Sequence, residues 1–384
     1  MAEANSIKHY PVDNGDMTLI QIGSKGVGKT VLVDMKIRGS NENSDTQFDV
    51  AADIYKHLPT NSNGSPYVDL FVLTHPDDDH CLGFDKYMHT GSPSDCSEPK
   101  EGEPKKIVMN EIWFSEICTK RASEETRLSA DAKAFRTEAK RRRQLFEDGG
   151  TNKSIDGNKL KVVGMDTDDS DKKESWYLDG MVIQKGDEVE VGTAKALILA
   201  PLDDEIFDEE HQQDKNNSSV VIRWTVNYAQ ILLGGDATAH IWKHIWEENK
   251  YNTSKLKYDL LLAPHHCSWH TLSYDSASKT DNPKVLPEAK SALSQANSGA
   301  HIVSSSKKIE KEQKDPPSHL AKEEYLDILN GNNKRFTCLA DSATETKPPK
   351  PRNLTLSISG VSLVSLIAPA AAAIPKQDKP IRHG

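Results

Sequence analysis

A group of potential metal ligands lies in residues 74–83, which read Thr-His-Pro-Asp-Asp-Asp-His-Cys-Leu-Gly and follow an apolar run at 68–73. Imidazole nitrogens and carboxylate oxygens are ligands that suit Zn, Mn or Fe, and close spacing at a strand end lets several of them reach one ion. The candidate ligands in this segment are His75, Asp77, Asp79 and His80.

Two later segments repeat the design of an apolar strand followed by polar ligands. The run 231–233 leads through two glycines to Asp236, and the run 260–262 leads through Ala-Pro to His265 and His266. An isolated His–Asp pair is more often plain surface, but recurrence after separate predicted strands favours a metal site.

These residues resemble the His-x-His-x-Asp-His signature of the metallo-β-lactamase superfamily, with Asp77 in the place of the second histidine. The most similar branch is the hydrolase domain of the DNA-uptake competence protein ComEC and its soluble relatives, whose signature often reads Thr/Ser-His-Pro-Asp-x-Asp-His. Further segments resemble that branch in the same order: 12–16 (Val-Asp-Asn-Gly-Asp), 30–34 (Thr-Val-Leu-Val-Asp), 216–221 (Asn-Asn-Ser-Ser-Val-Val), 235–237 (Gly-Asp-Ala) and 265–268 (His-His-Cys-Ser). The resemblance implies an α/β fold, an αββα sandwich of two mixed β-sheets flanked by helices.

The resemblance also implies one or two divalent metal ions, Zn or Mn, with Mg possible. The implied ligands are, for the first ion, His75 and Asp77; for the second, Asp79, His80 and one of the pair His265/His266; and, as the bridge between them, Asp236. We favour His265 as the ligand because it comes first after the strand. That choice leaves His266 to orient a ligand or to act as the leaving-group acid. The catalytic residues are then Asp79, Asp236 and His266.

One histidine of the superfamily pattern is missing. Only His89 and His211 lie between His80 and Asp236, and neither follows a predicted strand. The resembling branch carries an Asn-Ser segment in this region, here at 217–218. An oxygen-rich first site of this kind tolerates Mn or Mg better than a site with three histidines.

The implied chemistry is that of a metal-dependent hydrolase, foremost a phosphodiesterase or nuclease that uses a metal-activated hydroxide. Two ions about 3.5–4 Å apart clamp the attacking and leaving oxygens of an in-line displacement. Two alternatives stay open: a hydrolase of a small substrate (a lactone, a thioester or a cyclic nucleotide), and a metal-binding scaffold without catalysis. The expected partner is nucleic acid or a small phosphodiester, and the sequence does not identify any protein partner.

The composition is polar and mildly acidic. The 384 residues carry a formal net charge of −10, and 36% of them are hydrophobic. A global basic footprint for nucleic acid is absent, although bound metal ions add local positive charge. Five cysteines without a Cys-x-x-Cys motif, and a start without the apolar core of a signal peptide, predict a cytoplasmic protein.

We expect one hydrolase domain over residues 1–367, with a helical and polar insert at about 115–175 and a disordered tail at 368–384. The insert contains a predicted helix at about 123–147 and then a flexible loop at 151–175. The arginine run 141–143 on this helix is a basic patch that could contact phosphates, although a solvated helix face is the commoner role.

Two segments invite a different interpretation. Residues 23–30 match the P-loop pattern, but the strand-like segments 17–22 and 30–35 on either side predict a hairpin turn instead of a phosphate-binding helix start. Residues 353–375 are uncharged and long enough to cross a bilayer. Their alternation of apolar and hydroxylated residues predicts a β-hairpin, so no stable membrane association is expected.

Overall fold

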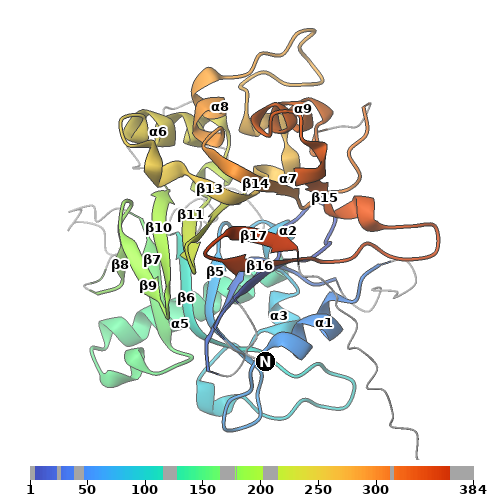
Figure 1. The fold of residues 1–384 in the computed structure, drawn as a ribbon. Coiled ribbons are helices and arrows are strands. Elements are labelled where there is room, and N and C mark those ends of the chain that lie inside the picture. Colours follow the sequence, from blue (N-terminus) through green and yellow to red (C-terminus); the bar gives the residue numbers. More distant parts are fainter. Residues whose placement is uncertain are drawn as a thin grey trace, which may run out of the picture.

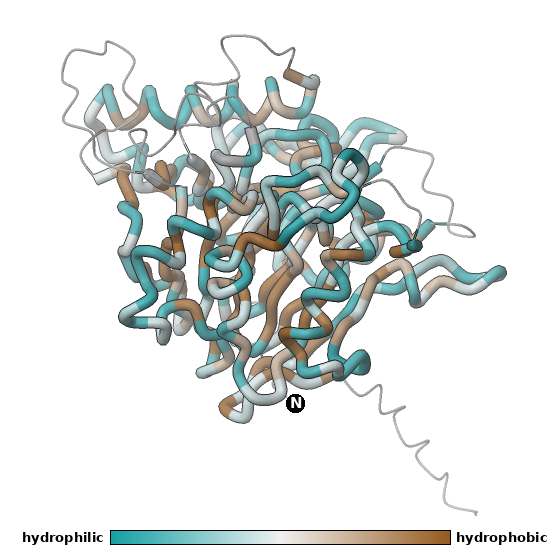
Figure 2. Tube along the Cα trace, turned by 90° about the horizontal axis from the view of Figure 1, so that it is seen from above, coloured by the Kyte–Doolittle hydropathy of each residue, from teal (hydrophilic) through white to brown (hydrophobic). Residues whose placement is uncertain are grey.

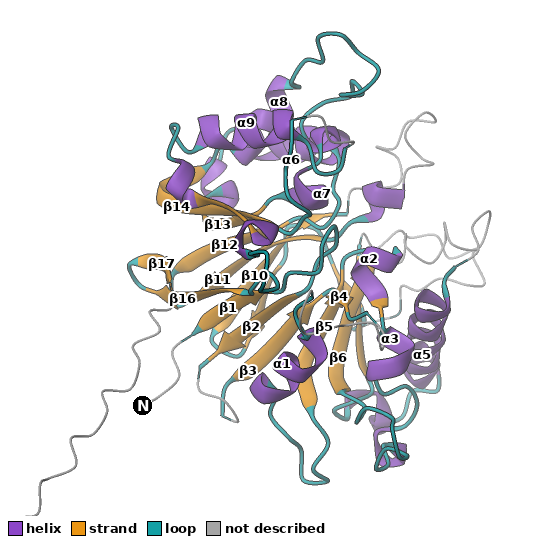
Figure 3. Ribbon diagram, turned by 90° about the vertical axis from the view of Figure 1, so that its right-hand side faces the viewer, coloured by secondary structure: helices purple, strands orange, loops and turns teal. Residues whose placement is uncertain are grey.

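The computed structural model describes residues 5–23, 27–38, 47–115, 128–164, 178, 180–201, 215–311 and 315–363. The chain forms two β-sheets packed face to face between two layers of helices (Figure 1), and Figure 3 shows these layers from the side. This αββα sandwich of two mixed sheets confirms the expected fold class.

The first sheet has nine strands in the order β17-β16-β1-β2-β3-β5-β6-β7-β8. Their bounds are β17 Gly360–Leu363, β16 Arg352–Ser357, β1 Ser6–His9, β2 Thr18–Ile22, β3 Lys29–Val33, β5 Tyr67–Leu73, β6 Val108–Ser115, β7 Lys159–Val163 and β8 Val182–Ile183. Pairing is antiparallel from β17 to β3 and parallel from β3 to β8. The short strand β4, Met35–Lys36, follows β3.

The second sheet has seven strands in the order β15-β14-β13-β12-β11-β10-β9. Their bounds are β15 Phe336–Cys338, β14 Ala296–Ser304, β13 Tyr258–Leu262, β12 Ala229–Leu233, β11 Val221–Val226, β10 Ala194–Ala200 and β9 Glu188–Val191. The strands from β15 to β12 are parallel, and those from β12 to β9 are antiparallel. Each sheet therefore has an antiparallel part and a parallel part, and the parallel part runs to one edge of the sheet.

Helices cover the outer face of each sheet. Those on the first sheet are α1 (Val50–His57), α3 (Phe84–Tyr87) and α5 (Ala130–Glu147); those on the second are α6 (Ala239–Asn249), α8 (Pro287–Leu293) and α9 (His319–Ile328). The one-turn helices α2 (Asp78–Cys81) and α7 (Pro264–Cys267) lie near each other in both Figure 1 and Figure 3. No helix in the described ranges is long and apolar enough to cross a membrane.

The core follows from strands that are apolar on both faces. In β5, Leu70 and Val72 face the other sheet, whereas Phe71 and Leu73 face the helices. Such double burial is typical of parallel strands covered on both sides. Between the sheets Trp113 stacks on Trp224, with ring centroids 6.2 Å apart and planes 10° apart. Figure 2 shows hydrophobic segments gathered inside the tube trace and hydrophilic ones around it.

Two hairpins were predicted from the sequence, one around residues 23–30 and one near the end of the chain. The strands on either side of residues 23–30 form an antiparallel hairpin in which Ile22 pairs with Lys29, which confirms the turn and rules out the P-loop geometry. Strands β16 and β17 confirm the terminal hairpin. The tail expected at 368–384 lies outside the described residues, as do 116–127 and most of 165–179 of the expected insert.

Two expectations about the region after α5 were wrong. Residues 159–163, expected in a flexible loop, form β7, because Leu160 and Val162 are buried under α5 while Lys161 between them points the other way. The sequence also predicts a strand at Val182 in the second sheet, but the segment 182–183 pairs with β7 as the edge of the first sheet. Both strands are too short to show a clear alternation in the sequence.

The predicted helix at about 123–147 is present from Ala130, but its arginine run is not a free basic patch. Arg142 is buried, with 1% of its side chain exposed, and lies 2.7 Å from Glu138 Oε1. Arg141 pairs with the same carboxylate, and Arg143 pairs with Glu147. The run therefore holds the helix to the sheet, and the phosphate-binding interpretation loses its basis.

Candidate metal centre

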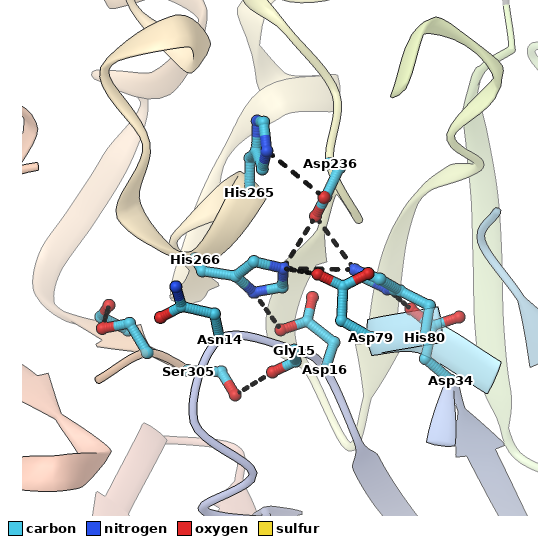
Figure 4. A network of polar contacts seen from close by, with 12 residues as sticks. Asn14, Gly15, Asp16, Asp34, Asp79, His80, Asp236, His265, His266 and Ser305 are labelled. Atoms are coloured by element: carbon cyan, nitrogen blue, oxygen red, sulfur yellow. Dashed lines mark hydrogen bonds and ion pairs between the residues drawn. The ribbon is translucent and has the colours of Figure 1, made fainter. Parts of the chain in front are cut away.

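The candidate residues gather where strands of both sheets end. His75 follows β5 with only Thr74 between them, and α2 comes next, while Asp236 follows β12 and α7 follows β13. Strands β12 and β13 are parallel neighbours, so their carboxyl ends meet at one edge. The loop between β1 and β2 brings Asp16 to the same place (Figure 4).

Asp236 lies at the centre of the group, and its two oxygens face different histidines. Oδ1 lies 3.1 Å from His80 Nε2 and 3.4 Å from His266 Nε2. Oδ2 lies 3.6 Å from His75 Nε2 and 3.5 Å from His265 Nε2. A carboxylate placed in this way can bridge two ions, one on each oxygen.

Asp79 completes the group on the His266 side. Its Oδ2 lies 3.3 Å from His266 Nε2, and 34% of its side chain is exposed. Within the described ranges, two sets of ligand atoms each lie within 4.8 Å of one another: Asp16, His80, Asp236 and His266, and then His75, Asp79 and His80. His80 belongs to both sets.

The chemistry of this donor set fits a divalent metal. Ligand atoms around a tetrahedral ion with bonds of about 2.0–2.1 Å lie roughly 3.3 Å apart, which is close to the separations observed. His80 Nε2 and His266 Nε2 point at each other across 3.4 Å. His75 Nε2 is buried and makes no hydrogen bond within the described residues. Buried polar atoms without partners are costly unless an ion or water satisfies them.

His80 is oriented by residues on neighbouring parallel strands. Its Nδ1 lies 2.8 Å from Asp34 Oδ2, and Asp34 also accepts hydrogen bonds from the backbone N–H and the hydroxyl of Thr74, both at 2.7 Å. A proton on His80 Nδ1 leaves the Nε2 lone pair for an ion. Asp34 has φ 55°, a left-handed conformation that Asp tolerates better than most residues.

His266 has a similar carboxylate behind it. Its Nδ1 lies 3.5 Å from Asp16 Oδ1, which is longer than the contact of Asp34 with His80. The Asp16 loop is held from both sheets: Asp16 N–H donates to the Asp79 carbonyl oxygen, and Ser305 Oγ donates to the Gly15 carbonyl oxygen at 2.5 Å (Figure 4).

A left-handed turn decides which of the paired histidines points inward. His265, His266 and Cys267 have φ values of 51°, 52° and 66°. Each left-handed non-glycine residue costs roughly 1–2 kcal/mol, and such strain concentrates at functional sites. The turn buries His266 completely and leaves 15% of the His265 side chain exposed.

The charges of the group depend on one another. Burial would lower the pKa of His80, but Asp236 and Asp34 raise it well above its usual value. In the same way, against the effect of burial, Asp236, Asp16 and Asp79 raise the pKa of His266 to about 10. Burial would raise the pKa of Asp236, yet the surrounding histidines, His266 first, hold it well below its usual value. Protons and metal ions would therefore compete for His80 and His266.

The structure brings most of the predicted residues together. His75, Asp79, His80, Asp236 and His266 belong to the two ligand sets and His265 lies beside Asp236, whereas the predicted ligand Asp77 belongs to neither set. Asp77 precedes α2, and its carbonyl oxygen accepts hydrogen bonds from the backbone of His80 and Cys81. The sequence favours His265 over His266 as the ligand; in the structure both face Asp236, and His266 is the more deeply buried.

Four further residues of the group received no role from the sequence: Asp16, Asp34, Thr74 and Ser219. Ser219 Oγ accepts a hydrogen bond from Asp236 N–H at 3.1 Å, so the segment near 217–218 supports the bridging residue from behind. Asp34 follows an apolar strand just as Asp236 does, and this pattern would have been enough to name Asp34 as a candidate site residue. Of the two intervening histidines, His89 Nε2 bonds the Ser92 carbonyl oxygen, and His211 lies outside the described residues.

No protein-family model and no curated protein sequence matches the chain. Among solved structures, it resembles CmlA, a diiron β-hydroxylase from Streptomyces venezuelae, at 12% identity and a TM-score of 0.41 over 92% of this chain and 55% of that one. It also resembles YhfI, a metallo-β-lactamase fold protein from Bacillus subtilis, at 10% identity and a TM-score of 0.39 over 91% of this chain and 100% of that one.

A possible metal-dependent hydrolase from Veillonella parvula gives 9% identity and a TM-score of 0.39 over 90% of this chain and 100% of that one. The chain thus spans about half the length of CmlA. At such identities and scores, the fold assignment rests on the sheet order and layers of this molecule.

Proposed function

We propose that the protein is a divalent-metal-dependent hydrolase that cleaves phosphodiester bonds. The observation that carries this proposal is the position of Asp236, whose two oxygens each face a separate pair of histidines. This is the arrangement that two neighbouring ions need, and two such ions suit in-line displacement at phosphorus.

The proposed ligands differ in part from those expected from the sequence. One ion would be held by Asp236 Oδ2, His75 and His265, and the other by Asp236 Oδ1, Asp79, His80 and His266. His265 then supplies the first site with the histidine that the superfamily pattern lacks in this chain. Asp77 has no part in either site.

Bound divalent ions would act as Lewis acids on the phosphate ester and would lower the pKa of a bound water molecule toward neutral pH. The chain's own residues orient the ligands and shield the site from bulk water. Asp34 directs His80, and the complete burial of His75, His80 and His266 excludes bulk water from behind the site. Asp79 and His265 are the more exposed ligands, so the substrate approaches on their side.

The direct test is cleavage of bis(p-nitrophenyl) phosphate and of single- and double-stranded DNA and RNA with Mn, Mg or Zn. Asp236→Asn should lower kcat by about 10²-fold or more, because it removes the shared charge from both ions. Asp77→Asn is the matched control, and its kcat should stay within a few-fold of the wild type.

Failure to cleave any of these diesters with any of the three metals would refute the phosphodiesterase proposal. Hydrolysis of a lactone or thioester that depends on Asp236 would then support the small-substrate alternative. Circular dichroism of each variant shows that lost activity is not lost folding.

A further inference from the structure

A cationic side chain lies against the loop that carries Asp16. An ideal Cβ on Gly15, which has φ +155°, would lie 2.5 Å from Lys36 Cδ and 2.7 Å from the Asp79 carbonyl oxygen. Only glycine leaves room for this approach. Lys36 therefore lies next to the backbone of Gly15 and Asp79, at the border of the candidate metal centre.

The ammonium group of Lys36 has spare hydrogen-bonding capacity. It donates to the Asn14 carbonyl oxygen, and this is its one hydrogen bond in the described part of the chain. An ammonium carries three donors. Burial lowers the pKa of Lys36, and the nearby charge of Asp79 opposes this effect. A half-buried cation with unused donors is a favourable place for an anion.

Two further cations lie around the same loop. Arg38 Nη1 lies 3.0 Å from Asp13 Oδ2, and the backbone N–H of Lys307 donates to Asn14 Oδ1 at 3.0 Å. Both cations act on Lys36 by charge repulsion. Asp79 and Asp13 attract Lys36 and partly offset this repulsion, and a phosphate is a further anion that the three cations could hold.

We propose that Lys36, with Arg38 and Lys307, forms a subsite that receives a second phosphate group of the substrate, next to the phosphate that is cleaved. This inference rests on the proposed function and narrows it. The preferred substrate is a phosphodiester that carries a further phosphate, such as an oligonucleotide or a 5′-phosphorylated dinucleotide, and a lone diester is a poorer substrate.

The subsite can be tested without the metal ions. Wild-type protein in EDTA should bind inorganic pyrophosphate in isothermal titration calorimetry. Lys36→Met keeps the apolar stem and should weaken this binding about tenfold or more, in line with a lost charge-assisted hydrogen bond. Lys195→Met is the matched control, because Lys195 is exposed and pairs with Glu188 at 2.7 Å on the remote strand β10.

Lys307→Gln is a second test variant, chosen in case Lys36→Met fails to fold. The Lys307 side chain is exposed and its contact with Asn14 uses the backbone, so the loop is retained. This variant should weaken pyrophosphate binding a few-fold, since it removes one charge at the rim. Unchanged binding in both Lys36→Met and Lys307→Gln would overturn the subsite.

The second part of the test measures hydrolysis of two dinucleotides. The kcat/KM of Lys36→Met should fall about tenfold more for pTpT, the 5′-phosphorylated thymidine dinucleotide, than for TpT, which lacks that phosphate. Lys36→Arg should recover most of the difference. Equal losses on both dinucleotides would contradict the subsite while leaving the hydrolase proposal intact. A wild type that cleaves neither dinucleotide but binds pyrophosphate through Lys36 would refute the hydrolase proposal and retain the anion site.

Discussion

Two carboxylates stand behind two of the histidines that face Asp236. The Asp34–His80 contact is short and shared with Thr74, whereas the Asp16–His266 contact is longer and comes from a loop. Such pairs fix the tautomer and direction of an imidazole before an ion arrives. The difference in length indicates that His80 is the better prepared ligand.

The Asp34–His80 pair gives a prediction at the scale of one atom. In Asp34→Asn the amide oxygen keeps the bond from Thr74 N–H, so the NH₂ group faces His80 Nδ1. His80 must then place its proton on Nε2, where it blocks the ion. Metal affinity should fall about 10–100-fold, as measured by competition with a chromophoric chelator.

Asp69→Asn is the control for this change. Asp69 is also largely buried and accepts hydrogen bonds from Lys29 and Thr30, but it lies on β5 at the other end of the strand. Its metal affinity should match the wild type. An equal loss in both variants would mean that a general destabilisation, and not the imidazole tautomer, lowers the affinity.

The charge state of the histidines predicts that metal binding releases protons. In the metal-free fold the pKa of His266 is raised to about 10 and that of His80 lies well above its usual value, so both are protonated at pH 7. Metal ligation requires neutral imidazole, so roughly two protons should leave per protein at pH 7. Titrations in buffers of different ionisation enthalpy count them.

The sign of the pH dependence follows from the same shifts. Metal affinity should rise with pH up to about pH 10, because a proton competes with the metal ion for His266 at every pH below its folded-state pKa. In the metal-free protein the raised pKa values stabilise the fold fully below about pH 6.5, and this contribution is lost as the pH rises through the folded pKa. No proton release at pH 7 would show that the histidines are already neutral.

At the scale of elements, α5 is attached to the first sheet through a buried ion pair. Arg142 donates to Glu138 Oε1 at 2.7 Å and to the carbonyl oxygens of Lys159 and Met109, both at 2.9 Å. Three elements therefore meet at one guanidinium. The planar fork of arginine suits this role, since lysine would supply a single point of contact.

Removing this guanidinium should destabilise the fold. Arg142→Ala leaves Glu138 and two carbonyl groups buried with fewer partners, and the free energy of unfolding should fall by about 3–5 kcal/mol. Arg143→Ala, which breaks a half-exposed pair with Glu147, should cost about 0–1 kcal/mol. Urea denaturation of both variants makes the comparison, and equal losses would refute the buried role of Arg142.

Elements with a strong apolar period were predictable from the sequence, and short or turn-dependent ones were not. The run at 68–73 is long enough to identify a doubly buried strand, and the residues after it had to lie at the sheet edge. Which of His265 and His266 is more deeply buried depends on a left-handed turn, and the spacing of apolar residues does not predict such a turn. Contacts between distant elements, such as Asp16 with His266, depend on tertiary packing that periodicity does not encode.

At the scale of the whole molecule, the candidate metal centre joins the two halves of the sandwich. Asp79 and His80 come from the first half, and Asp236, His265 and His266 from the second. The Asp16 loop crosses the same boundary through Ser305 and Pro316. The chain as a whole is acidic, with a net charge of −10, whereas the proposed anion subsite is a local group of cations. This difference favours a substrate that is bound by a few specific contacts and not by the overall charge.

The most direct test of the central claim is the metal content of purified protein after loading with Mn or Zn and removal of free ions. We predict roughly one to two ions per wild-type chain, none in Asp236→Ala, at least one fewer in His266→Ala, and the wild-type content in Asp77→Ala. A folded wild type that retains no divalent ion, or an Asp77→Ala that loses as much metal as Asp236→Ala, would contradict the account.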